Sequence, residues 1–268
     1  MTIFGARRPV ALTAVLALAL AACSSSPKGP GQDPNEPNRL YSEAKEDLAN
    51  GSYERAIKGF ERVEAAASGT LLAQQALLEQ AYAQWRSGER TLALAAADRF
   101  LRNHPSSPAY DYGLYLRGLI NFNDNLGLFG NLSGQKLAER DQRASREAHQ
   151  SFKQLVEQFP TSRYTPDARV RMDYIVNSLA EHEVHVARYY FRRGAYLAAA
   201  NRARQAITEF EQVPIAEDAL QLMVLSYDRL GLTELRDDTL RVLKRNFPNA
   251  RLSADGTRPE SKPWWQLW

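Results

Sequence analysis

The residues best spaced for metal chemistry are two histidines, His182 and His185, three positions apart in a charged stretch. Side chains three apart on a helix share one face, so the two imidazoles could form one corner of a metal site. No third ligand stands at a recognisable spacing, and a charged, exposed helix face explains the same residues. The chain also lacks a glycine-rich phosphate loop, a nucleophile elbow and a paired-carboxylate motif. We therefore expect a protein without catalytic activity, metal or other cofactor.

The single cysteine, Cys23, stands where a covalent lipid is expected. Residues 1–8 are short and basic, and residues 10–20 form an almost unbroken run of Ala, Leu and Val. Such a run is too short to span a bilayer and is typical of a signal peptide. It ends in Leu-Ala-Ala-Cys, which resembles a bacterial lipoprotein signal. This resemblance implies removal of residues 1–22, S-diacylglycerol and N-palmitoyl groups on Cys23, and, from the following Ser24, sorting to the outer membrane.

Composition indicates a folded protein whose main partner is not nucleic acid. Hydrophobic residues make up 44% and charged residues 24% of the 268 positions. Removing residues 1–22 takes away two arginines and no acid, so 34 − 2 = 32 basic residues face 31 acidic ones. A net charge so near zero argues against nucleic-acid binding. Outside the folded part, we expect a flexible tether over 23–38, and a disordered tryptophan-rich tail over 250–268 that docks on a partner or a lipid headgroup layer.

A helical hairpin repeats along the rest of the chain. In its clearest copy, Gly194 allows the turn between two helices and Tyr196 follows two residues later. Small side chains then recur on one face of the second helix, at Ala199, Ala203 and Ala206. The interval from glycine to the closing proline is 17 residues in two other copies, Gly88–Pro105 and Gly231–Pro248. This is the tetratricopeptide (TPR) pattern of about 34 residues per unit. We predict an all-α solenoid of about five hairpins over 39–249, at about 39–66, 70–104, 108–160, 166–212 and 216–248.

Two of these units depart from the regular repeat. In the third, an Asn- and Gly-rich insert over 121–140 carries exposed apolar residues, which is typical of a functional loop. In the fourth, a helix starts at Thr165-Pro166 and meets no breaker before Gly194. It would be about 27 residues long, twice the usual repeat helix. We expect it to project beyond the stack and to offer its outer turns to a partner.

Several stretches resemble the BamD/ComL family, the lipoprotein subunits of the β-barrel assembly machinery of Gram-negative outer membranes. The matching pieces are Asp111-Tyr112…Tyr115…Arg117-Gly118-Leu119, Arg140-Asp141…Ala148…Phe152…Leu155-Val156…Pro160-Ser162-Tyr164, Val186-Ala187…Tyr189-Tyr190…Arg193-Gly194-Ala195-Tyr196, and Asn201-Arg202. The resemblance covers about residues 40–248. It implies a non-catalytic scaffold, lipid-anchored at the periplasmic face of the outer membrane. The C-terminal repeats would bind a BamA-like barrel subunit. The N-terminal repeats would receive the C-terminal signal of unfolded outer-membrane proteins and dock other Bam lipoproteins.

The resemblance also implies partner-binding residues in two regions. They are Arg188, Tyr190, Arg193, Asn201 and Arg202 in the fourth unit, and Asp111, Tyr112, Arg117, Arg140 and Asp141 in the third. Arg202 has two interpretations, because its guanidinium suits bidentate pairing with a partner carboxylate but could equally belong to a solvated basic face. Tyr189 and Tyr190 are expected to pack along the long helix, with one of them pointing outward.

Some features depart from the family. The connection over 65–70 lacks a loop with proline and aromatic residues, which bears on any substrate contact there, and the tryptophan-rich tail is not a family feature. Two other functions remain open. Another TPR lipoprotein, such as a pilotin or a protease adaptor, would share the lipidation signal and the repeats. The helical arm of a peptidoglycan-cleaving enzyme would need a catalytic domain for which the chain has no room.

Overall fold

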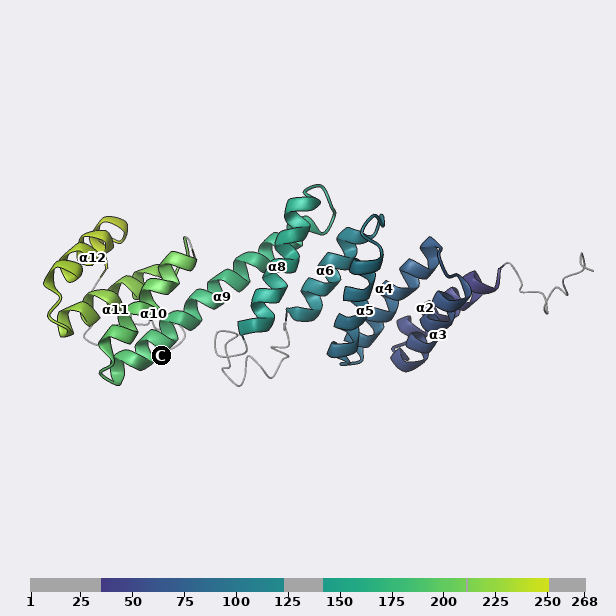
Figure 1. Cartoon of the computed structure of the whole chain (residues 1–268), viewed down its shortest axis with the longest axis horizontal. Helices are drawn as coiled ribbons and strands as arrows, with labels where there is room; N and C mark the ends of the chain where they lie inside the picture. The colour runs from purple at the N-terminus through teal and green to yellow at the C-terminus, as the bar shows by residue number, and fades with distance from the viewer. Residues whose placement is uncertain (1–34, 123–141, 211, 251–268) are drawn as a thin grey trace, which may run out of the picture.

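The computed structural model describes residues 35–122, 142–210 and 212–250. Within these ranges the chain forms ten α-helices and no strand, and each helix packs against the next in an elongated array (Figure 1). None of the helices in these ranges is long and apolar enough to cross a membrane. The predicted all-α solenoid of helical hairpins is confirmed.

Five hairpins make up the array, each a pair of antiparallel helices. They are α2 (Glu36–Ala49) with α3 (Tyr53–Ala66), α4 (Leu71–Arg86) with α5 (Arg90–Asn103), α6 (Tyr110–Asn121) with α8 (Gln142–Gln158), α9 (Thr165–Arg192) with α10 (Tyr196–Glu209), and α11 (Ala216–Arg229) with α12 (Thr233–Asn246). The first helix starts at Glu36, three residues before the predicted start of the solenoid at 39. Pro37 lies in its first turn, where a missing backbone N–H costs no hydrogen bond, so the proline does not delay the helix.

Glycines close the turns within four of the hairpins. Gly51, Gly88, Gly194 and Gly231 have φ angles of +73°, +90°, +77° and +70°, a backbone region that side chains with a Cβ rarely adopt. These turns follow α2, α4, α9 and α11, and they lie along one edge of the array, the lower edge in Figure 1. The connections between hairpins lie along the opposite edge. The solenoid therefore has a glycine edge and a connection edge.

The first helix of each hairpin lies on the inner side of the array. Helix α2 contacts α4, α4 contacts α6, and α9 contacts α11, whereas no comparable contact joins α3 to α5, α5 to α8 or α10 to α12. In these three places first helices approach one another while second helices spread apart, which is the geometry of a curved solenoid. The inner surface is thus built by α2, α4, α6, α9 and α11.

Small side chains bring the paired helices close together. Ala199, Ala203 and Ala206 of α10 are fully buried against α9 and α11, as the sequence stripe predicts. Tyr196 closes this hairpin with its ring 5.3 Å from that of Phe191. The same stripe of small residues recurs in α5, where Ala93 and Ala97 are fully buried.

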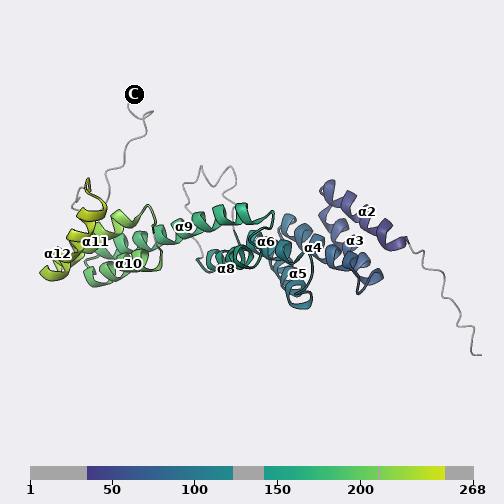
Figure 2. The same cartoon turned by 90° about the horizontal axis from the view of Figure 1, so that it is seen from above.

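The long helix α9 does not project beyond the stack, which corrects the expectation from the sequence. It spans 28 residues, close to the predicted length, but both of its halves are covered. Ile175 and Leu179 pack into one core with α8, and Val184 and Phe191 pack into a second core with α10 and α11. Figure 2 shows α9 continuing from the N-terminal part of the array to the C-terminal hairpins. Helix α9 therefore connects the core that it shares with α8 to the core that it shares with α10 and α11.

A close approach at Gly118 fixes α6 against α8. A Cβ placed at this position would lie 2.4 Å from Cε1 of Phe152, whose side chain is fully buried. We therefore predict that Gly118→Ala destabilises the protein by about 1–3 kcal/mol through overpacking. An exposed helical glycine would instead gain about 1 kcal/mol from the same change. Urea unfolding of the two chains, followed by circular dichroism, measures the difference.

Phe152→Leu supplies the control, because a smaller side chain leaves room for the new methyl group. Gly118→Ala should then cost less in the Phe152→Leu background than in the wild type. An equal cost in both backgrounds would contradict the steric explanation.

Candidate interaction surfaces

One pocket opens on the inner surface of the N-terminal hairpins. It has a volume of about 560 Å³ and lies between α4, the start of α6, and the α5–α6 and α8–α9 connections. Its lining comprises Leu71, Gln74, Gln75, Leu78, Glu79, Ser107, Pro108, Ala109, Asp111, Tyr112, Arg163 and Tyr164. Apolar and hydrogen-bonding groups alternate around it, which is the composition of a peptide or small-ligand site.

Three tyrosines form a rigid wall beside this pocket. The ring of Tyr164 lies 5.3 Å from that of Tyr112 and stacks at 4.8 Å on that of Tyr115. The Tyr115 hydroxyl donates to Asp167 at 2.7 Å, which holds α6 against the start of α9. Burial raises the pKa of the Tyr112 hydroxyl, and burial with the Asp167 bond raises the pKa of Tyr115 to about 12. Both hydroxyls therefore stay protonated at neutral pH, and the single proton of the Tyr115 hydroxyl is donated to Asp167.

Two polar groups of the pocket have capacity for a ligand. The side-chain Oε1 of Gln74 is buried and accepts no hydrogen bond from the residues that the structure describes, a costly state that an incoming N–H would relieve. The Arg163 guanidinium lies 4.7 Å from the Tyr164 ring centroid and remains exposed, so it can meet a carboxylate. Together with Leu71 and Leu78, these groups suit an extended peptide that carries apolar side chains and a negative charge.

The predicted residues of the third unit divide between this pocket and the framework. Tyr112 lines the pocket. Asp111 also borders it, but its carboxylate accepts from the Ser162 hydroxyl at 2.6 Å and from the Tyr112 backbone N–H at 2.7 Å. Arg117 donates to Asp98 at 2.7 Å and to Ser151 at 2.8 Å, and so joins α6 to α5 and α8. Arg117 thus holds three helices together within the chain. Arg140, Asp141 and most of the insert lie outside the described residues, as do Cys23 and the tail after 250.

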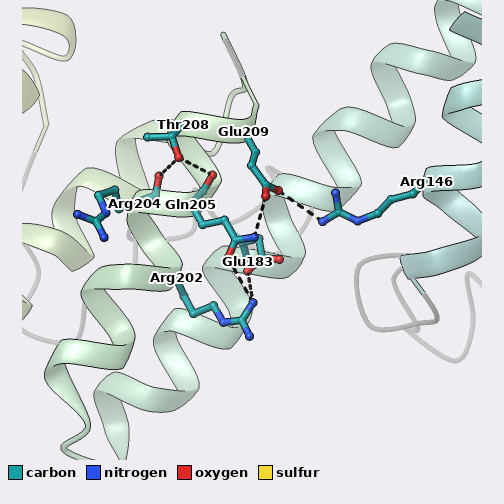
Figure 3. Close-up of polar contacts among 7 residues, drawn as sticks. All are labelled: Arg146, Glu183, Arg202, Arg204, Gln205, Thr208 and Glu209. Atoms are coloured by element: carbon teal, nitrogen blue, oxygen red, sulfur yellow. Dashed lines mark hydrogen bonds and ion pairs between the residues drawn. The ribbon is translucent and has the colours of Figure 1, made fainter.

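The second region is a chain of polar contacts on α9 and α10. Arg202 donates to Glu183 at 3.0 Å, and the Glu183 side chain is only 6% exposed (Figure 3). Gln205 accepts from Arg202 at 3.4 Å and donates to Glu209 at 3.0 Å. Glu209 in turn pairs with Arg146 of α8 at 3.5 Å, so the chain of contacts reaches from α9 to the preceding hairpin. Arg202 thus pairs with a carboxylate of its own chain, while 43% of its side chain remains exposed.

The other predicted residues of the fourth unit differ in their burial and in the groups that they contact. Arg188 is three-quarters buried and pairs with Asp218 of α11. Tyr190 packs against the C-terminal core, whereas its neighbour Tyr189 points outward, as one of the two was expected to do. Arg193 is exposed and lies 5.4 Å from the Tyr189 ring centroid. Asn201 is exposed and accepts from Arg204 at 3.1 Å.

His182 and His185 are not part of a metal site among the residues that the structure describes. His185 is exposed and His182 is half-buried on α9. No group of three His, Cys, Asp or Glu side chains suited to a metal ion occurs among the residues that the structure describes. The pair fits the interpretation as part of a charged helix face.

Sequence reasoning missed the pocket residues that come from connections and helix starts. Leu71 and Gln74 lie in the first turn of α4, Arg163 lies in the α8–α9 connection, and none of them belongs to a local motif. Only the packing of α4, α6 and α9 around one point brings them together. In the structure, Leu71 at the start of α4 is 63% exposed, and this exposure marks the rim of the pocket.

Comparison with known proteins identifies similar chains along nearly the whole length. A family model described as YfiO, outer membrane lipoprotein, matches residues 33–253. An outer membrane protein assembly factor BamD from Neisseria meningitidis is 40% identical over 269 residues, which cover 97% of this chain and 99% of the relative. Proteins of the same name from Haemophilus influenzae and Vibrio cholerae are 33% and 32% identical, over 89% and 88% of this chain and 90% and 97% of theirs.

The ion pair between Arg202 and Glu183 leads us to predict how substitutions of these residues change the free energy of unfolding. Arg202→Gln would leave the buried Glu183 carboxylate without its cation, and we expect a loss of about 1–3 kcal/mol in the free energy of unfolding. The double variant Arg202→Gln with Glu183→Gln removes both charges, so its loss should be smaller than the sum of the two single losses. Thermal and urea unfolding of the four chains measure the coupling. Additive losses would show that the two side chains do not interact.

Proposed function

The chain belongs to the YfiO family of outer-membrane lipoproteins, which includes the BamD assembly factors, and on this premise we propose that it is a non-catalytic scaffold for outer-membrane protein assembly. The relatives that carry the name assembly factor match almost end to end. A solenoid without a chemical centre in its described residues acts by holding partners in a fixed arrangement.

Substrate binding is assigned to the N-terminal hairpins, and the pocket carries this assignment. Its apolar wall, the free Oε1 of Gln74 and the exposed Arg163 match an extended segment with aromatic or aliphatic side chains and a terminal carboxylate. The C-terminal signal of an unfolded outer-membrane protein has this chemistry. The loop over 65–70, which departs from the family, immediately precedes Leu71, so the pocket accepts such a segment without a contribution from an aromatic loop residue.

The C-terminal hairpins are assigned to the barrel-forming, BamA-like subunit, and other Bam lipoproteins would dock on the N-terminal half. This division places the two ligands at opposite ends of the array, because α4 and α6 lie far from α11 and α12 in Figure 1. One protein can then hold a substrate and the barrel subunit at the same time. A pilotin or protease adaptor would not be expected to share the family match over residues 33–253.

Membrane attachment is assigned to Cys23, with S-diacylglycerol and an N-palmitoyl group. The residues between Cys23 and Glu36 could span at most about 45 Å when fully extended. The anchor would therefore keep the first hairpin within that distance of the periplasmic face of the outer membrane. Two or more acyl chains are needed for stable anchoring, since a single chain binds only marginally.

The pocket can be tested with a matched pair of exposed leucines. Leu71→Asp places a carboxylate at the rim of the pocket, where it would repel an acidic, apolar ligand. We expect it to raise the Kd of a fluorescent peptide with the C-terminal sequence of an outer-membrane protein at least tenfold, measured by anisotropy. Leu92→Asp is the control, because Leu92 is 54% exposed on α5, outside the pocket. Equal Kd values for the two variants would contradict the assignment.

Lipid attachment makes a separate prediction. Mass spectrometry of the protein extracted from membranes should show a chain that starts at Cys23 and carries the added mass of its acyl groups. Cys23→Ser should release the protein from the membrane fraction while leaving the Kd for the signal peptide unchanged. An uncleaved or unmodified N-terminus in the wild type would exclude the anchor without bearing on the pocket.

A further inference from the structure

A cluster of tryptophans follows the last helix of the solenoid. Trp264, Trp265 and Trp268 stand within five residues, together with Leu267. They lie outside the part of the chain that the structure describes, so the sequence alone characterises them. A tryptophan side chain has a large apolar ring and an indole N–H that can only donate a hydrogen bond. A binding site for it must therefore provide an apolar surface and a hydrogen-bond acceptor in the same place.

The pocket beside α4 provides both of these groups. Leu71 and Leu78 contribute apolar side chains to its lining, and Tyr112 contributes an aromatic ring. The side-chain Oε1 of Gln74 belongs to the same lining, is buried, and accepts no hydrogen bond from the residues that the structure describes. An indole N–H would satisfy this oxygen, and because the indole has no acceptor of its own, no further buried group would be left unpaired.

Arg163 adds a contact that suits an aromatic ring. Its guanidinium lies 4.7 Å from the Tyr164 ring centroid, and the side chain is exposed. Arginine stacks on the faces of aromatic rings, and tryptophan is the ring that attracts a cation most strongly. A tryptophan stacked on Arg163 would continue the row of rings that Tyr115 and Tyr164 form. Alternate side chains of an extended segment share a face, so Trp264 and Trp268 can reach the pocket and its rim together.

The dimensions of the chain favour a pocket on another molecule. The pocket lies at the start of α9, where Arg163 and Tyr164 precede the helix, whereas α12 packs on α11 near the other end of α9 (Figure 2). Helix α9 spans 28 residues and is therefore about 42 Å long. A segment as long as residues 251–264 spans only about 20 Å, whether as a coil or as a helix. It would seldom bridge a separation comparable to α9, and the pocket of a neighbouring molecule carries no such limit.

We propose that the tryptophan segment, residues 264–268, of one molecule docks in the pocket of a neighbouring molecule. The contact joins two different surfaces, so it is heterologous and can link successive copies head to tail. The inference rests on the proposed function for its consequence, because that function assigns the same pocket to the signal of an outer-membrane protein. A docked tryptophan segment then keeps one pocket closed until a signal segment displaces it.

Two complementary variants of the full-length lipoprotein in detergent test this docking. Trp264→Ser, Trp265→Ser and Trp268→Ser together make the tail variant, and Leu71→Asp, which places a charge at the rim, is the pocket variant. In sedimentation velocity the wild type should associate as its concentration rises, and each variant alone should stay monomeric. An equimolar mixture of the two variants should form a dimer, because one supplies an intact pocket and the other an intact tryptophan segment. The control Leu92→Asp, exposed on α5 outside the pocket, should associate as the wild type does.

Gln74→Leu isolates the hydrogen bond to the indole. The substitution keeps a side chain of similar size and removes the buried acceptor, so the Kd for association should rise about tenfold. An unchanged Kd would overturn the docking of an indole at this position. Equal melting temperatures of all variants establish that lost association is not lost folding.

The outcomes separate this docking from the proposed function. A wild type that binds the signal peptide but stays monomeric at every concentration would overturn the docking and leave substrate binding in place. Copies that associate through the pocket but bind no signal peptide would overturn the substrate assignment instead. Association that persists in both variants, or a mixture that forms no dimer, would also overturn the docking. So would tail tryptophans whose fluorescence shifts to the blue only with lipid vesicles, because the headgroup layer would then be their site.

Discussion

Every part of this molecule depends on the inability of one helical hairpin to bury both of its faces. A hairpin gains stability only from its neighbours, so the array must be continuous from α2 to α12. Small residues make that continuity possible. The alanines of α5 and α10, and Gly118 opposite Phe152, let backbones approach so closely that little space remains between the layers. The surfaces left exposed are then the inner face, the outer face and the two edges.

Charged residues connect the layers after the apolar contacts have brought them together. Arg99 pairs with Glu64 across the first two hairpins, Arg117 joins three helices, and Arg202 reaches the buried Glu183. Exposed pairs of this kind contribute little, whereas the partly buried ones fix the relative positions of helices.

The periodic features of the fold could be predicted from the sequence, and the composite ones could not. Glycine turns, the alanine stripe and the length of α9 follow from local spacing, and the structure has them at the predicted residues. The covering of both halves of α9 was missed, because packing by two different hairpins has no local signature. Likewise, no spacing rule shows that Arg163 faces Leu71, or that Glu183 takes the guanidinium of Arg202. A resemblance matches a residue to a position in the family's sequence pattern. Only the tertiary contacts show whether the side chain at that position already has a partner within the chain.

The shared helix α9 has a consequence for how the two halves of the protein can diverge. An α-helix turns by about 100° and rises by about 1.5 Å per residue. One residue inserted between Leu179 and Val184 would therefore swing the last three helices by more than a quarter turn relative to the first seven, and would turn the second apolar stripe away from α10. Changes of about seven or eleven residues, close to two or three full turns, restore the phase. The separation between the N-terminal and the C-terminal hairpins can therefore change through the middle of α9 only in steps of whole helical turns.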